Sequence, residues 1–257
     1  MTGTSVLEQV LRRDRLIVAI GLAAVVALSW GYLIAGAGID MSMADMPMDP
    51  EPWSPAQALI MFAMWWVMMI AMMVPGATPM VLLFTAIKRR QGEKNSVLLA
   101  WLFLAGYLVI WAGFSLVAVL VQWALERVGL FSQSMMTSTS TMLAGIILLA
   151  AGLYQLTPIK RACLRYCENP LFFLSRYWQP GALGALRMGF RHGSYCVGCC
   201  WFLMALLFVT GVMNLIWIVA VAIYVGFEKL LPRSQWLSRA AGIALIISAA
   251  VVFTRAA

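Results

Sequence analysis

The chain has 257 residues, of which 63% are apolar and only 11% are charged, and its mean hydropathy is +0.89. A soluble domain is usually about 45–50% apolar and about 25% charged, and a water-soluble globule of this size cannot cover so much apolar surface. These values exclude a soluble enzyme. They also exclude an outer-membrane barrel, whose strands alternate around a polar lumen. We therefore predict an all-α fold, a polytopic helical membrane bundle.

The formal net charge of +8 is typical of a membrane protein whose cytoplasmic loops are basic. Basic and aromatic residues do not alternate along a hydrophilic segment, so nucleic acid is not an expected partner. The expected environment of the chain is the lipid bilayer.

Seven segments are apolar enough to be membrane-spanning helices, given that a span needs about 20 mostly apolar residues. They cover residues 16–35, 56–84, 96–122, 142–156, 185–209, 214–230 and 236–253. The first segment follows a basic cluster, and Ala35-Gly36-Ala37 resembles a signal-peptide cleavage site. However, its apolar run is longer than the roughly 7–15 residues of a signal peptide. We therefore interpret it as a retained span in a single transmembrane domain, residues 1–257.

The basic residues test this topology. With the N-terminus inside the cell, all of the 18 basic residues except Arg127 and Arg255 fall in the first segment's leader or in inner loops. This distribution satisfies the positive-inside rule at every loop. It predicts seven spans with the N-terminus inside, the C-terminus outside, and a cytoplasmic loop over residues 157–180. In that loop, Thr157 as N-cap, Pro158 as first helical residue and the stop Asn169-Pro170 predict a short helix.

The outer loop, residues 38–55, is rich in methionine and carboxylates, with no amphipathic period that would bury its methionines. Thioethers are soft ligands that suit Cu(I), so the loop is a candidate for copper capture. Alternatively, it is a lid that lies on the bilayer surface or caps the helices. The candidate ligands of this loop are Met41, Met43, Met46 and Met48.

The second predicted span carries a methionine stripe at helical spacing, which is either a metal path or adaptable packing. The stripe consists of Met61, Met64, Met68 and Met72. Pro75 and Pro79 follow it and lack the N–H groups that would bond to earlier carbonyls. Carbonyls freed at membrane depth must face protein or a wet cavity, and broken helices often line transport sites. We therefore expect a helix break directly after the stripe.

The cysteines lie in two groups at the inner side, with the only histidine beside the second group. Cys163 and Cys167 share one face of the short cytoplasmic helix. Cys196, Cys199 and Cys200 begin the fifth span, and one stripe there reads Met188, His192, Cys196, Cys199 or Cys200, and Met204. Thiols on the cytoplasmic side stay reduced, so disulfides are not expected. Thiolates and thioethers select Cu(I), and four thiolates suit zinc.

Glu228 and Lys229 end the sixth span, in a chain whose spans carry almost no other ionisable residue. They are either an interfacial anchor pair or a functional site, because ionisable groups within spans are functional candidates by default. A buried carboxylate at Glu228 would carry a proton or act as the last ligand of a metal path.

Several motifs together resemble an uncharacterised bacterial family described as predicted metal-binding integral membrane proteins. The resemblance covers about residues 55–235 and does not include the methionine-rich loop. It implies a membrane protein with a metal site and supplies neither a substrate nor a mechanism. The motifs are Met64…Ala71-Met72-Met73-Val74-Pro75…Pro79, Gly152-Leu153-Tyr154-Gln155…Pro158…Lys160…Cys163-Leu164…Cys167…Pro170, Gly193…Cys196-Val197-Gly198-Cys199-Cys200-Trp201…Met204, Gly211…Met213-Asn214 and Glu228-Lys229.

Three functions remain open from these residues. The first is transport or delivery of a soft metal, Cu(I) with zinc as the alternative, across the bacterial inner membrane, with a soluble metal carrier as partner. The second is a subunit or assembly factor of a larger membrane complex. The third is a thiol oxidoreductase that uses Cys196-Val197-Gly198-Cys199. The sequence has no GxxxxGK[ST] phosphate-binding motif, and no catalytic residue is predicted.

Overall fold

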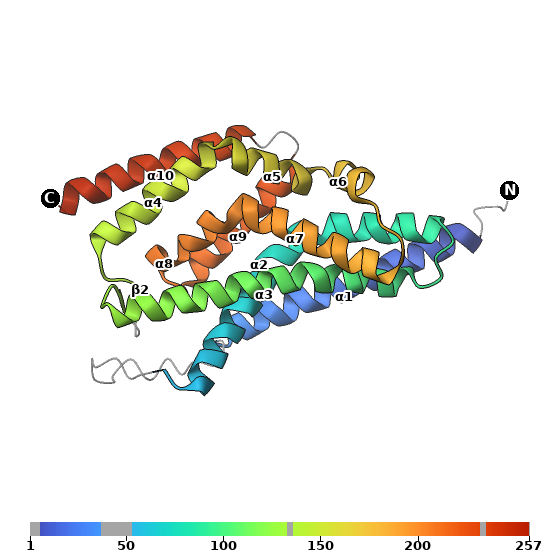
Figure 1. Ribbon diagram of the computed structural model, residues 1–257, viewed down its shortest axis with the longest axis horizontal. Coiled ribbons are helices and arrows are strands. Elements are labelled where there is room, and N and C mark those ends of the chain that lie inside the picture. Colours follow the sequence, from blue (N-terminus) through green and yellow to red (C-terminus); the bar gives the residue numbers. More distant parts are fainter. Residues whose placement is uncertain (1–5, 37–52, 133–135, 232–234, 257) are drawn as a thin grey trace.

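The computed structural model describes residues 6–36, 53–132, 136–231 and 235–256, and almost all of them are helical (Figure 1). The all-α prediction is confirmed for this part of the chain; its only strands are a two-residue pair, β1 (Phe131–Ser132) and β2 (Thr137–Ser138). The helices are α1 (Val6–Ile34), α2 (Pro55–Arg90), α3 (Ser96–Arg127), α4 (Thr141–Leu156), α5 (Pro158–Glu168), α6 (Pro170–Tyr177), α7 (Gly181–Ala205), α8 (Leu207–Thr210), α9 (Leu215–Leu230) and α10 (Gln235–Ala256).

Within the described residues, five helical segments are long and apolar enough to cross a membrane. They are Arg12–Ile34, Pro55–Arg90, Ser96–Arg127, Gly181–Thr210 and Gln235–Arg255, and the bent pair of α4 and α5, at 67°, would be a sixth. The sequence predicted seven spans; α4 and α9 have 16 residues each, less than the usual length of a span. The seven-span topology and its orientation therefore stay predictions.

The helices run back and forth along one common direction, and the start of α1 and the end of α10 lie at opposite ends of the bundle (Figure 1). The long α1, α2 and α3 lie together on one side, and α4 packs along α10 on the other. Between these two groups lie α7 and α9. This arrangement encloses α7, which carries Cys196, Cys199 and Cys200.

The helix α2 continues through both of its prolines, so the expected break after the methionine stripe was wrong. Ser54 accepts a hydrogen bond from the Gln57 backbone N–H at 3.2 Å, and Pro55 occupies the first turn. Pro75 and Pro79 then lie inside one helix of 36 residues. Each proline removes only one helical hydrogen bond, and packing against neighbouring helices allows a membrane helix to continue through it.

Close packing of α3 against α7 fixes the centre of the bundle. A Cβ atom added at Gly189 would overlap the backbone oxygen of Phe103, and one at Gly106 would overlap that of Leu186. Small residues allow two helix backbones to approach in this way, which is the usual device of helix contact in membranes. The approach brings the α3 residue Tyr107 against the cysteines of α7.

Candidate metal centre

The short helix α5 packs on α7 and brings the two predicted cysteine groups together. Thr157 caps α5 by accepting the Lys160 N–H at 3.2 Å, as its position before Pro158 predicts. The Cys163 sulfur lies 2.9 Å from the place that a Cβ of Gly198 would take. Further along α5, the Cys167 thiol interacts with the thiols of Cys196 and Cys199.

Three buried cysteines on one turn of α7 form the centre of this region. The thiols of Cys199 and Cys200 donate hydrogen bonds to the backbone oxygen of Cys196, at 3.1 and 2.9 Å. All five cysteines, Cys163 and Cys167 included, are free thiols. The Cys196 sulfur itself faces neighbouring helices rather than its own backbone.

A methionine of α2 and a lysine of α9 complete a group that we call the sulfur cluster: Met73, Cys196, Cys200 and Lys229. The Cys200 sulfur lies 3.9 Å from the Met73 sulfur. The Lys229 Nζ lies 3.0 Å from the Cys196 sulfur and 3.4 Å from the Met73 sulfur. Soft ligands from two separate helices thus surround one buried cation.

Tyr107 of α3 closes the sulfur cluster from a fourth side. Its hydroxyl lies 3.0 Å from the Cys196 sulfur and donates a hydrogen bond to the Met73 backbone oxygen at 3.2 Å. Tyr107 is fully buried. It therefore holds α2 and α7 in register at the cluster.

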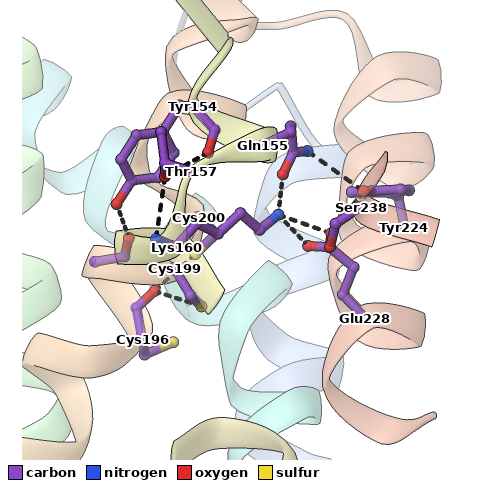
Figure 2. Close-up of polar contacts among 11 residues, drawn as sticks. Tyr154, Gln155, Thr157, Lys160, Cys196, Cys199, Cys200, Tyr224, Glu228 and Ser238 are labelled. Carbon is purple, nitrogen blue, oxygen red and sulfur yellow. Dashed lines mark hydrogen bonds and ion pairs between the residues drawn. The ribbon is translucent and has the colours of Figure 1, made fainter. Parts of the chain in front are cut away.

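Glu228 belongs to a second buried group, which we call the carboxylate cluster. The Lys160 ammonium lies 2.7 Å from both carboxylate oxygens of Glu228, and it also donates to the side-chain oxygen of Gln155. Tyr224 and Ser238 each donate to Glu228 at 2.6 Å. Figure 2 shows Lys160 reaching from α5 between Gln155 and Glu228.

Glu228 and Lys229 are therefore not an interfacial anchor pair, the simpler of the two sequence interpretations. Both side chains are buried, and they face different partners. Successive residues of a helix point about 100° apart, which sends the carboxylate toward α5 and α10 and the ammonium toward α2 and α7.

His192 lies one turn before Cys196, as predicted, in an aromatic pocket. Its ring packs against those of Phe103, Tyr107 and Phe173, and it is buried. Within the described residues its Nδ1 atom has no hydrogen-bond partner. A buried polar atom without a partner is rare and costly, so it calls for an explanation.

The other predicted ligands are placed as follows. Met64, Met68, Met72 and Met204 are buried in the hydrophobic core, as packing alone would also place them. Met41, Met43, Met46 and Met48 lie outside the described residues. Within the described part of the chain, no three His, Cys, Asp or Glu side chains stand together as a ready metal site.

An open cavity of about 520 Å³ lies beside the N-terminal half of α7. Its wall includes Met188, Arg191 and Tyr195 of α7 and Tyr177 of α6. The Tyr177 and Tyr195 hydroxyls are 2.7 Å apart. Hydrogen bonds with Tyr195 and Tyr166 lower the pKa of Tyr177 to about 8. Arg191 and Tyr195 thus place polar side chains of the cavity wall on α7 shortly before Cys196.

A family model described as the copper chaperone PpoB2 matches residues 62–252. The chain belongs to this copper chaperone family. The match contains every member of the sulfur cluster and begins after the methionine-rich loop. Copper is the metal that the family description names; zinc is not supported. No curated protein and no solved structure shows significant similarity to the chain.

Sequence reasoning missed Met73, Tyr107 and Lys160 of this chain as site residues. Met73 lies one position off the predicted stripe, although its spacing of four from Met69 marks a second stripe. Lys160 was counted as a cytoplasmic loop charge, and only its burial in the structure shows its role. The contacts of Lys229 with Cys196 and Met73 had no sequence signal, because the three residues lie on different helices.

Proposed function

We propose that the chain is a multi-pass protein of the bacterial inner membrane that binds Cu(I) at the sulfur cluster and delivers it to an acceptor. The observation that carries this proposal is the convergence of Cys196, Cys200 and Met73 from two helices within a copper chaperone family. Thiolate and thioether ligands together select Cu(I) over harder metal ions.

The ligand set suits a cargo ion rather than a permanent one. Cu(I) accepts few ligands, so two thiols and one thioether suffice to hold it. Structural sites that bind tightly, such as those of zinc, close the ion in four strong ligands. The thiols of Cys167 and Cys199, which lie beside the cluster, are available as alternative ligands during transfer.

The buried methionines of α2 supply a path to the cluster from the other end of the helix. Met64, Met68 and Met72 follow one face of α2, and Met73 is on the next turn after Met69. We assign these thioethers, and the loop methionines beyond them, to capture and relay of Cu(I). Thioethers bind Cu(I) less strongly than thiolates, so the order favours movement toward the cysteines.

The stripe Met188, His192 and Cys196 supplies the path onward. Met188 lines the open cavity, Cys196 belongs to the sulfur cluster, and His192 lies between them with an Nδ1 atom that has no hydrogen-bond partner among the described residues. A role for the His192 Nδ1 atom as a transient ligand of the ion explains why this atom is buried without a hydrogen bond. A soluble metal carrier that docks at the cavity would then receive the copper.

Copper analysis of the purified, full-length protein tests the proposal. We expect the wild type to bind Cu(I), and Cys196→Ser and Met73→Leu to lower the affinity by about 100-fold and about tenfold, respectively, by analogy with losses of metal ligands and their supports. Met80→Leu is the matched control, because Met80 is buried on the same helix outside the cluster.

Three results would contradict the proposal. One is a wild type that retains no Cu(I) and is isolated instead with stoichiometric membrane partners, as a structural subunit would be. Another is a mixed disulfide trapped in the Cys200→Ser variant without bound metal, as in a thiol oxidoreductase. Unchanged copper content and cuproenzyme activity in cells that lack the protein would exclude a role in delivery.

A further inference from the structure

Lys229 places an ammonium group among the sulfur atoms of the cluster. Its Nζ contacts the Cys196 sulfur at 3.0 Å and the Met73 sulfur at 3.4 Å. The groups that face it come from three helices: Cys196, Cys199 and Cys200 on α7, Met73 on α2 and Tyr107 on α3. Its immediate surroundings are thus almost entirely soft ligands.

This pairing is unusual, because a buried ammonium normally pairs with a carboxylate. The carboxylate of Glu228 is the preceding residue, yet it pairs with Lys160 instead. Lys229 is therefore not needed to neutralise Glu228. Its ammonium contacts the same two sulfur atoms, one thiol and one thioether, that would bind a metal ion.

We propose that Lys229 is a resident cation that occupies the Cu(I) position while the site is empty, so that Cu(I) binds only when the ammonium withdraws. The inference rests on the function proposed above. An atom that contacts both sulfurs fills the space in which an ion bridging them would lie. In addition, two positive charges in one buried site repel each other strongly.

Helix α2 leaves space for the lysine side chain in its observed position and offers the ammonium an alternative place. A Cβ atom at Gly76 would lie 2.9 Å from the Lys229 Cδ, so the glycine leaves room for the lysine side chain against α2. Pro75 and Pro79, which lack N–H groups, leave the carbonyl oxygens of Ala71 and Pro75 without their helical donors. These carbonyl oxygens of α2 are acceptors for the Lys229 ammonium once it is displaced from the sulfurs.

The resident cation explains how a buried thiol site releases its cargo. Without it, thiol ligands in a low-dielectric environment would retain Cu(I) strongly. With it, the ammonium returns to the two sulfur atoms as Cu(I) leaves and takes over the position of the positive charge. Lys229 is thus a positioning residue that lowers the affinity for Cu(I) and speeds its transfer to an acceptor.

The test compares wild type with Lys229→Leu in the purified, full-length protein, because leucine removes the ammonium without adding a ligand atom. A chelator of known Cu(I) affinity competes with each protein. We expect Lys229→Leu to bind Cu(I) about tenfold more tightly, which corresponds to the loss of one competing interaction, and to pass it to the chelator more slowly. Lys88→Leu is the matched control, because Lys88 is a buried lysine that donates instead to the Gln179 backbone oxygen; it should leave the affinity unchanged.

A second variant keeps the inference testable if Lys229→Leu does not fold. Gly76→Ala retains every ligand and crowds the Lys229 side chain, so it should raise the Cu(I) affinity a few-fold. Unchanged or weaker binding in the folded variants would overturn the resident cation. If, at the same time, the wild type binds Cu(I) and Cys196→Ser does not, the proposed function is supported although the resident cation is rejected. A wild type without Cu(I) would overturn both.

Discussion

The end of α9 contributes consecutive residues to two buried clusters that differ in chemistry. Around Glu228, an ammonium, a phenol and a hydroxyl all donate to one carboxylate. Around Lys229, an ammonium meets two sulfur atoms. Both residues are almost completely buried. Burial alone therefore does not distinguish a structural cluster from a functional one.

The difference lies in whether the charges are satisfied. The carboxylate cluster is closed, since each Glu228 oxygen has strong donors and a fully paired network gives rigidity. The sulfur cluster is not, because thiols and thioethers are weak hydrogen-bond partners but good ligands for soft metal ions. The carboxylate cluster thus fixes α4, α5, α9 and α10, while the sulfur cluster remains available for exchange.

The largest expected effect comes from opening the carboxylate cluster. Glu228→Gln leaves the Lys160 ammonium buried without its counter-charge, and we expect it to lower the free energy of unfolding by about 3–5 kcal/mol. Denaturant unfolding in detergent measures this loss. The double variant Lys160→Met/Glu228→Leu, which removes both charges, should recover most of it. A loss in the double variant equal to that in the single one would show that the ion pair is not the cause.

An intermediate effect should follow from separating α3 and α7. Gly189→Ala forces a methyl group into the Phe103 backbone, and overpacking of this kind costs about 1–3 kcal/mol. Because α3 carries Tyr107, the change should weaken Cu(I) binding at the sulfur cluster. Gly113→Ala on α3 is the control, since a Cβ there meets no atom within 4 Å of the described structure. Equal copper affinity in both variants would contradict the coupling of α3 to the site.

The smallest effects come from single hydroxyls, one in each cluster. Ser238→Ala removes one donor to Glu228, and Tyr107→Phe removes the hydroxyl beside Cys196; each should lower stability by about 1 kcal/mol. Only Tyr107→Phe should also lower Cu(I) affinity, by about tenfold, because it supports a proposed ligand. Parallel unfolding and chelator-competition measurements separate the two. If Ser238→Ala alters copper affinity to the same extent, the clusters do not act separately.

Much of the helical framework could be predicted because its signals are local. Apolar runs and capping residues act on neighbours in sequence, so Thr157 and Pro158 define the start of α5 correctly. The prolines misled for the same reason: each removes one hydrogen bond, but packing by neighbouring helices keeps α2 intact through both.

The candidate site could be predicted only in part. Helical spacing gives the cysteine turn of α7 and the pair on α5, because residues three or four apart share a face. It selected Met64, Met68 and Met72 but missed Met73, which makes the sulfur contact with Cys200. The choice between the two faces of α2 depends on which helix packs there, and spacing within one helix carries no such information.

The sequence by itself determined that this chain is apolar and helical and that its cysteines gather in two groups at helical spacing. Only the tertiary structure decided that α2, α7 and α9 meet at one point, that Glu228 and Lys229 face different partners, and that an ammonium lies between two sulfurs. The physical reason is range. Helices form through contacts within a few residues, whereas the sulfur cluster joins residues as far apart as Met73 and Lys229, which only the packing of whole helices brings together.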